Sequence, residues 1–389
     1  MMTKKPDIQT QIVQAEIGAD PAFRAVAPPL YTSTTYLWPN ANEKGPYDYG
    51  RSNNPNRDGL ARILAKLEGG EHAVVTSSGM AAIDLCLNLI HADDLIIAPH
   101  DCYGGTYRLL ENRAKQGRIR VDFVDQTNED ALNAALAQKP AMILIETPSN
   151  PLMRLVDLAK IASTAKAVGA IVVADNTFLS PVRQKPLDLG CDIVVHSTTK
   201  YLNGHSDVVG GAVIAKSTEH GEQLDWWANC TGVTGSPFDS WQTLRGLRTL
   251  STRMDVQEAN AQAIASFLHG HASVTHVYYP GLKSDVGYDL MKKQQSGPGA
   301  MLSFEVDTPA RAAHLMRSVK LFQLAASLGG VESLICQPST MTHRAMSVEA
   351  RLKAGLKENL IRISVGLENI DDLIADLSVN LTDKQNKAE

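Results

Sequence analysis

A lysine directly after an apolar run is the residue best suited to chemistry in this 389-residue chain. Lys200 lies in the segment His196–Tyr201, which follows the apolar run Cys191–Val195. A lysine that is partly withdrawn from water and close to other cations has a lowered pKa, and it can form a Schiff base with an aldehyde such as pyridoxal phosphate. An ordinary surface lysine is the alternative, because lysines after strands are common.

A carboxylate stands at the end of the preceding apolar run, one predicted strand before the run that leads to the lysine. Asp175 closes Ile171–Ala174, one predicted strand before Lys200. An aspartate there can pair with the protonated pyridine nitrogen of pyridoxal phosphate and keep the ring an electron sink. The alternative is an acidic cap on the following turn. The two residues together favour a cofactor site.

The start of the helical pattern Ala81–Ile90 is a candidate phosphate site. It follows a predicted strand, and the backbone N–H groups at such a helix start bind phosphate. An ordinary helix N-cap is the alternative. The phosphate candidates are Ser78, Gly79 and Met80, with the hydroxyls of Ser197 and Thr199 beside the lysine.

Two further strand ends carry an aromatic ring and an amide. Tyr103 can place its ring against a cofactor ring, and the side chain of Asn150 can hydrogen-bond a ring hydroxyl. A buried core tyrosine and a turn asparagine beside proline are the alternatives. Phosphate donors, an aromatic face, an amide, a carboxylate and a lysine at five strand ends jointly predict one cofactor site.

The elements that position these residues form an α/β pattern. Short apolar strands alternate with helical stretches such as Asn128–Gln138 and Leu155–Val168. This alternation predicts a mostly parallel sheet covered on both faces, with ligands bound beyond the carboxyl ends of the strands. The predicted strands are Ala73–Thr76, Leu95–Ala98, Val121–Val124, Met142–Ile145, Ile171–Ala174 and Asp192–Val195, with a further strand from Val208.

A second, smaller mixed region follows a helical stretch at residues 220–265. Its predicted strands are Ser273–Tyr278, Met301–Val306 and Leu360–Ser364. We therefore expect a cofactor domain at residues 61–256 and a C-terminal domain at residues 257–389. Residues 1–60 form an irregular arm in this interpretation, because most of that segment shows no periodicity.

Composition excludes several classes of protein. Hydrophobic residues make up 44% and charged residues 20%, which excludes a disordered or fibrous chain. The net charge of −5 argues against a nucleic-acid partner. No apolar run approaches the roughly 20 residues of a membrane span, and no signal peptide is evident, so we expect a cytoplasmic protein. The five cysteines show no CxxC pair, and no zinc or other metal site is predicted.

With these residues in view, the chain resembles the Cys/Met-metabolism family of pyridoxal-phosphate enzymes over nearly its whole length. The segment around the lysine, Ser197–His205, carries much of the resemblance. Two segments are more specific to the γ-synthase branch of the family, namely Ala98–Gly105 and Trp226–Asn229. The other matching segments are Ser78–Met80, Glu146–Pro151, Ser327–Ser333 and Met341–His343.

The resemblance implies a fold of the aspartate-aminotransferase type and a homotetramer built of active dimers. It gives Lys200 the covalent bond to the cofactor, Asp175 the pyridinium contact and Tyr103 the stacking ring. Sites are completed across the dimer interface in such enzymes. The resemblance further implies that Tyr49 and Arg51 of the neighbouring subunit meet the phosphate, that Arg362 grips the substrate α-carboxylate with help from Ser327, and that Arg108 meets a distal carboxylate.

The implied reaction is γ-replacement in methionine biosynthesis, in which O-succinylhomoserine and cysteine give cystathionine and succinate. The chain departs from the pattern at Ser52, where enterobacterial γ-synthases often carry a second arginine, and at Ala326, where many relatives have glutamate. These departures leave three alternatives open. The chain could use O-acetylhomoserine, catalyse γ-elimination on cystathionine, or bind the cofactor as a regulatory protein without catalysis.

Overall fold

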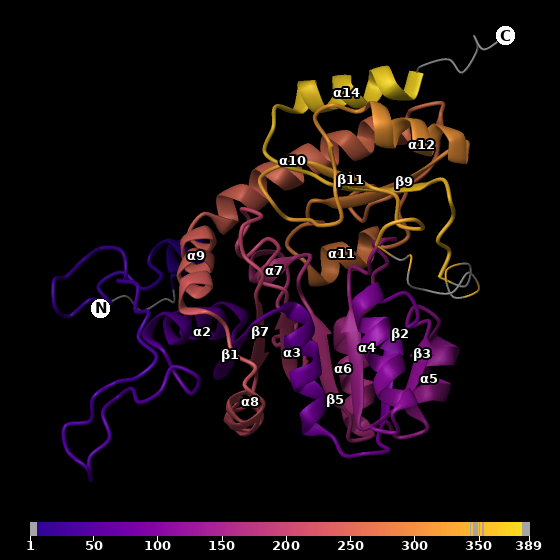
Figure 1. Ribbon diagram of the computed structural model, residues 1–389. Coiled ribbons are helices and arrows are strands. Elements are labelled where there is room, and N and C mark those ends of the chain that lie inside the picture. The colour runs from indigo at the N-terminus through magenta and orange to yellow at the C-terminus, as the bar shows by residue number, and fades with distance from the viewer. Residues whose placement is uncertain (1–5, 343, 345–348, 350, 352–353, 383–389) are drawn as a thin grey trace.

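The chain forms two bodies, each built on its own β-sheet (Figure 1). The computed structural model describes residues 6–342, 344, 349, 351 and 354–382. The larger body holds a seven-stranded sheet, and the smaller body holds a five-stranded sheet. One residue of the family segments, His343, lies outside the described residues.

The large sheet is mostly parallel, as predicted. Only β7 runs antiparallel to its two neighbours, β1 and β6, and the strand predicted from Val208 begins at Gly211. A Cβ atom at Gly211 would lie 2.1 Å from the carbonyl oxygen of Ser78, so glycine lets these two segments meet. In sheet order the strands are β1 (His72–Thr76), β7 (Gly211–Ala215), β6 (Ile193–His196), β5 (Ile171–Asp175), β4 (Met142–Glu146), β2 (Leu95–Pro99) and β3 (Arg120–Val124).

Helices cover both faces of this sheet, because successive apolar residues of its strands point to opposite sides. On one face Ile143 and Val172 pack with α2 (Pro55–Glu68), α5 (Glu129–Leu136) and α6 (Leu158–Ala167). On the other face, neighbouring strand residues such as Leu144 and Val173 pack with three other helices. These are α3 (Gly79–Cys86), which continues into the 3-10 turn η1 (Leu87–Leu89), α4 (Gly104–Lys115) and α8 (Thr218–Thr231).

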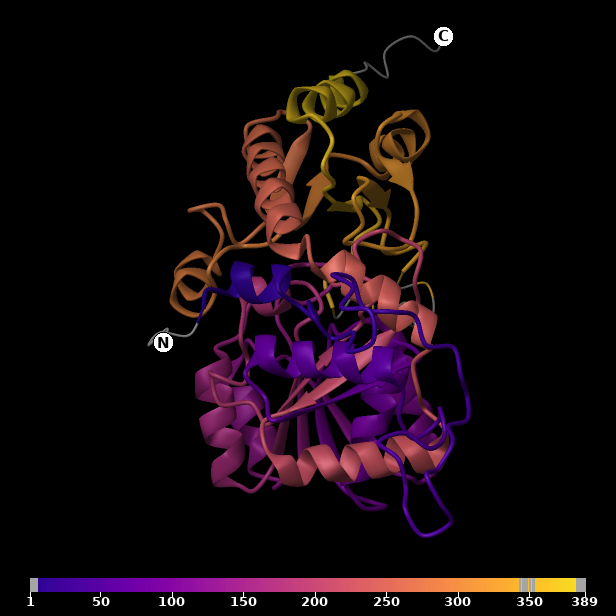
Figure 2. The same ribbon diagram turned by 90° about the vertical axis from the view of Figure 1, so that its left-hand side faces the viewer.

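The long helix α10 (Leu250–His269) follows α9 (Pro237–Leu247) and contacts β8 and β9 of the smaller sheet. Figure 2 shows the smaller body stacked on the larger one, with the last helix at its far end. The three predicted strands of this region are confirmed, and helices α10 and α12 both contact β9. In sheet order the strands are β10 (Gln323–Leu324), β11 (Leu334–Cys336), β12 (Leu360–Ser364), β9 (Met301–Val306) and β8 (Val274–Tyr278). Further helices among the described residues are α7 (Ser180–Arg183), α11 (Tyr288–Gln294), α12 (Pro309–Ser318) and α14 (Ile370–Thr382).

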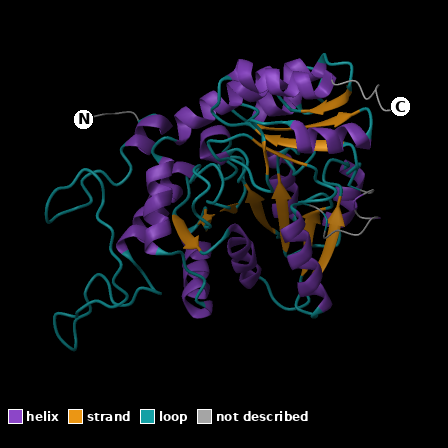
Figure 3. Cartoon of the chain, turned by 45° about the horizontal axis from the view of Figure 1, so that its top comes forward, coloured by secondary structure: helices purple, strands orange, loops and turns teal. Residues whose placement is uncertain are grey.

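The N-terminal segment is irregular after α1 (Ile8–Val13) and extends away from the larger body as a long loop (Figure 3). It exposes large apolar side chains, with Phe23 at 90% and Leu37 at 93% exposure. The division into an arm and two domains stays a prediction; α2 starts at Pro55, and α10 runs unbroken across residue 257.

Within the described part of the chain, no helix has the length and apolar character to cross a bilayer. The same residues hold no cluster of three metal-ligating side chains. All five cysteines are free thiols, and only Cys230 is exposed.

Candidate active site

A cavity of about 420 Å³ opens where the carboxyl ends of the large sheet meet the smaller body. Its size suits a small ligand. It collects eleven of the fourteen predicted site residues, which come from seven separate stretches of chain. They are Ser78, Gly79, Met80, Tyr103, Asn150, Asp175, Ser197, Thr199, Lys200, Ser327 and Arg362.

Lys200 projects into this cavity from the turn after β6. Its Nζ atom donates a hydrogen bond to Oγ of Ser327 at 2.9 Å. Burial disfavours the ammonium form, and the positive charge of Arg362 adds to this effect, so the pKa of Lys200 is lowered to about 8. An amine with this pKa is far more often neutral at physiological pH than a surface lysine, which makes it a nucleophile for an aldehyde.

Arg362 lies in β12 and is almost fully buried beside the lysine. Nη1 donates to Oδ1 of Asn150 at 2.8 Å, and Nη2 donates to the backbone oxygen of Ser327 at 3.0 Å. Its Nε atom is buried and has no hydrogen-bond partner among the described residues. A buried guanidinium with a donor left over is suited to bind a carboxylate.

Two carboxyl groups end neighbouring strands at the floor of the cavity. Glu146 of β4 and Asp175 of β5 are paired in register. Asp175 accepts the backbone N–H of Thr177 at 2.9 Å. Burial raises the pKa of both groups, and the charge of Asp175 helps to hold the pKa of Glu146 well above its usual range. A cationic ring nitrogen beside Asp175 would offset this burial, which fits the pyridinium contact expected of that residue.

Glu146 was not predicted as a site residue, although a signal was present. The strand Met142–Glu146 is buried throughout and apolar except for its last residue, which is charged and lies at the carboxyl edge where ligands bind.

The phosphate candidates surround the start of α3. Oγ of Ser78 caps the helix by accepting the N–H of Ala81 at 3.1 Å, so the N–H groups left for a phosphate are those that precede Ala81 in the first turn. A Cβ atom at Gly79 would lie 2.7 Å from Cβ of Ser197, so only glycine lets the helix start approach that serine. Thr199 lines the cavity, but its hydroxyl donates to the backbone oxygen of Gly210 at 3.2 Å and accepts from its N–H at 3.0 Å.

Tyr103 lies at the N-terminus of α4 and is 43% exposed, so the alternative of a buried core tyrosine is wrong. Its ring lies against Gly105, where a Cβ atom would come within 2.5 Å of the ring. Glycine at that position therefore leaves the ring free to lie along the cavity wall.

Three predicted residues do not line the cavity of their own chain. Arg51 donates from Nη1 to the backbone oxygen of Asn229 and to its Oδ1 at 2.8 Å, and Ser52 contacts the same Oδ1 at 3.4 Å. Tyr49 is half exposed on the N-terminal segment, and Arg108 is exposed on α4. Their roles toward the phosphate and a distal carboxylate stay predictions.

The donor set fits pyridoxal phosphate. A lysine with a lowered pKa, a carboxyl group for the pyridinium nitrogen, a helix start for the phosphate and a half-exposed aromatic ring converge on one cavity, and the fold presents them at its strand ends. This combination defines a pyridoxal-phosphate-dependent enzyme of the aspartate-aminotransferase type of α/β fold.

The comparison with protein families gives the same result. The model of the Cys/Met metabolism PLP-dependent enzymes matches residues 9–382, and the chain belongs to that family. It is 52% identical to cystathionine gamma-synthase of Escherichia coli, over 97% of each chain. It is also 43% identical to cystathionine beta-lyase of Lactococcus lactis subsp. cremoris, over 97% of this chain and 99% of that protein.

Solved structures agree with the sequence comparison. The crystal structure of cystathionine gamma synthase from Xanthomonas oryzae pv. oryzae, in complex with aminoacrylate and cysteine, matches with a TM-score of 0.96 and 51% identity. The match covers 97% of this chain and 98% of that one. Cystathionine gamma-lyase from Lactobacillus plantarum matches with a TM-score of 0.94 and 39% identity, over 96% of this chain and 98% of that one. The family, the fold and the cofactor are therefore shared by synthases and lyases alike.

The lowered pKa of Lys200 predicts how the cofactor-free protein takes up pyridoxal phosphate. Only the neutral amine attacks the aldehyde, so the rate of covalent attachment should rise about tenfold per pH unit below pH 8 and level off above it. Stopped-flow absorbance of the apoprotein mixed with the cofactor measures this rate. A rate that keeps rising in proportion up to pH 10, as for an ordinary lysine, would contradict the lowered pKa.

Proposed function

We propose that this protein is a transferase that forms a carbon–sulfur bond by γ-replacement. O-Succinylhomoserine and cysteine are the substrates, and cystathionine and succinate are the products, which is a step of methionine biosynthesis. The observation that carries the proposal is the 52% identity to cystathionine gamma-synthase of Escherichia coli over 97% of both chains, together with the retained lysine site.

Each residue of the cavity has a separate role in this reaction. When bound, pyridoxal phosphate acts as an electron sink for the bond changes at the substrate's carbon atoms. Arg362 binds the α-carboxylate of the substrate through its free Nε donor. Nζ of Lys200 would move protons at the α and β carbons of the substrate, and Tyr103 would receive the proton of the substrate amine.

Ser327 is placed to coordinate these steps. Its hydroxyl accepts from Nζ of Lys200, and its backbone oxygen accepts from Nη2 of Arg362. One residue therefore fixes the distance between the proton-transferring amine and the group that holds the substrate carboxylate, and good orientation of this kind lowers the barrier to proton transfer.

Elimination on cystathionine is the second candidate. Lyases of the family match this chain at 42–43% identity over 95–97% of its length, and Ala326 lines the cavity at the position where many γ-synthases and γ-lyases carry glutamate. The small side chain leaves this wall of the cavity without a carboxylate to orient the substrate.

A steady-state assay with cysteine and either O-succinylhomoserine or O-acetylhomoserine separates the candidates. We expect cystathionine to form faster from the succinyl ester, with 2-oxobutanoate as the minor product. A faster reaction with the acetyl ester would overturn the choice of donor. Release of mainly 2-oxobutanoate at saturating cysteine would show that elimination is the main activity.

We also propose that the active form is a homotetramer of two dimers in the cytoplasm. Tyr49 and Arg51 lie outside the cavity of their own chain and on a segment that exposes Phe23 and Leu37, which supports their contribution to a neighbouring subunit's site. The free cysteines support a reducing compartment.

A further inference from the structure

Glu146 joins the two loops that bring Tyr103 and Asn150 to the cavity. Its Oε2 atom accepts the backbone N–H of Tyr103 at 2.9 Å, and its Oε1 atom accepts the backbone N–H of Asn150 at 3.0 Å. These two loops follow different strands, β2 and β4. Because one carboxyl group holds both backbones, neither loop can shift without breaking a hydrogen bond to a buried side chain.

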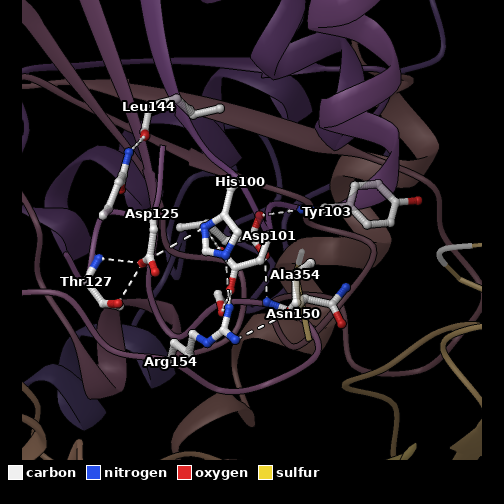
Figure 4. Close-up of polar contacts among 12 residues, drawn as sticks. His100, Asp101, Tyr103, Asp125, Thr127, Leu144, Asn150, Arg154 and Ala354 are labelled. Atoms are coloured by element: carbon white, nitrogen blue, oxygen red, sulfur yellow. Dashed lines mark hydrogen bonds and ion pairs between the residues drawn. The ribbon is translucent and has the colours of Figure 1, made fainter. Parts of the chain in front are cut away.

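A second carboxylate ties the same loops farther from the cavity. Oδ2 of Asp101 accepts from the hydroxyl of Ser149 at 2.8 Å and from Nη1 of Arg154 at 2.9 Å. Arg154 also contacts Nε2 of His100 and the backbone oxygen of Ala354, each at 3.2 Å (Figure 4). Asp101 does not line the cavity, whereas Glu146 does. The contact that faces the cofactor space is therefore the one made by Glu146.

The two loops carry side chains that would contact different parts of a flat ring, one its face and the other its edge. Tyr103 presents an aromatic face, and Asn150 presents an amide whose Oδ1 is already fixed by Arg362 at 2.8 Å. A ring held between such groups needs their separation to be constant to within a fraction of an ångström. Glu146 is the last residue of the buried strand β4, so the group that holds both loops is itself held by the sheet.

We propose that Glu146 is a positioning residue that sets Tyr103 and Asn150 at a fixed separation around the cofactor ring. The inference rests on the proposed roles of these two residues toward pyridoxal phosphate. It does not depend on which ester is the substrate or on whether replacement or elimination is the main reaction.

The Glu146→Gln variant of the holoenzyme tests this role. Glutamine keeps the shape of the side chain, but its amide oxygen can accept only one of the two N–H groups, and its NH₂ group faces the other donor. We expect bound cofactor with a visible circular dichroism band changed at least about twofold in intensity, because the ring is held differently. A loss of about 10- to 100-fold in kcat/KM should accompany it.

Glu305→Gln is the matched control, because Glu305 is a buried glutamate of β9 that also has two partners. It accepts the hydroxyl of Tyr278 at 2.7 Å and Nζ of Lys357 at 2.8 Å, outside the cavity. We expect E305Q to keep the dichroism band and kcat/KM of the unchanged protein. A wild-type band and a kcat/KM within threefold in E146Q would overturn the proposal, as would equal changes in both variants.

A second variant decides the matter if E146Q does not fold. Glu146→Asp keeps a carboxyl group but is one methylene too short to reach both N–H groups, so the same change of the dichroism band is expected, and an unchanged band overturns the proposal. Failure of the proposed γ-replacement would appear in the unsubstituted protein, whereas failure of this inference appears only in the comparison of variants.

Discussion

Lys200→Ala abolishes turnover in our expectation, with kcat reduced by at least about 10³-fold. The variant removes the amine that attaches the cofactor and that transfers protons near the substrate. The hydroxyl of Ser327, which accepts from Nζ at 2.9 Å, loses its partner, and no other lysine lines the cavity among the described residues. Steady-state cystathionine formation measures the loss. Reduction with borohydride followed by mass spectrometry should find the cofactor bound to the lysine only in the unsubstituted protein.

Lys216→Ala is the matched control for this prediction. Lys216 follows β7 at the opposite edge of the same sheet, where its side chain is half exposed and Nζ donates to the backbone oxygen of Gly69 at 3.1 Å. We expect this variant to keep kcat within about twofold, as is usual for surface substitutions. Residual turnover above about 1% in the Lys200→Ala variant would exclude the lysine as the essential proton carrier. An unsubstituted protein without a borohydride-reducible adduct would instead support a cofactor-binding protein without catalysis.

The sequence predicted the large sheet because its strands are buried on both faces. Runs such as Ile171–Ala174 are continuously apolar and are followed by a polar residue. The sequence pattern therefore predicts both the strand and the edge of the sheet at which ligands bind. The same rule located Asp175 and Lys200. It placed the last strand at Val208 instead of Gly211, because the apolar run Val208–Val209 precedes the glycines that start the pairing with β1.

The rest of the site could not be predicted in the same way, because its residues act through contacts with distant segments that the local sequence does not specify. Glu146 works by accepting two backbone N–H groups from distant loops, and any charged residue ending a strand looks alike in the sequence. Thr199 was predicted as a phosphate donor from its hydroxyl, yet that hydroxyl is hydrogen-bonded to the backbone of Gly210. Arg108 was predicted to bind a distal carboxylate only from the family resemblance, and it is not among the residues that line the cavity.

The second large effect is expected for Asp175→Asn, with kcat/KM reduced by about 10²- to 10³-fold. Asparagine keeps an oxygen that can accept the N–H of Thr177, so the turn after β5 should persist. It removes the negative charge that holds a proton on the ring nitrogen of the cofactor, and without that proton the ring withdraws electrons less effectively. Steady-state kinetics and the absorbance spectrum of the bound cofactor measure the two consequences.

Asp192→Asn separates the effect of this charge from a general weakening of the sheet. Asp192 precedes β6 at the opposite edge, where it accepts the N–H of Val172 at 2.9 Å and pairs with Lys166. Both variants therefore replace an aspartate that binds a backbone N–H near a strand end, but only Asp175 lines the cavity. If both lose kcat/KM equally, the loss comes from the fold. If D175N alone loses it and keeps its cofactor, the carboxylate acts on the ring, and a D175N loss below about tenfold would contradict that role.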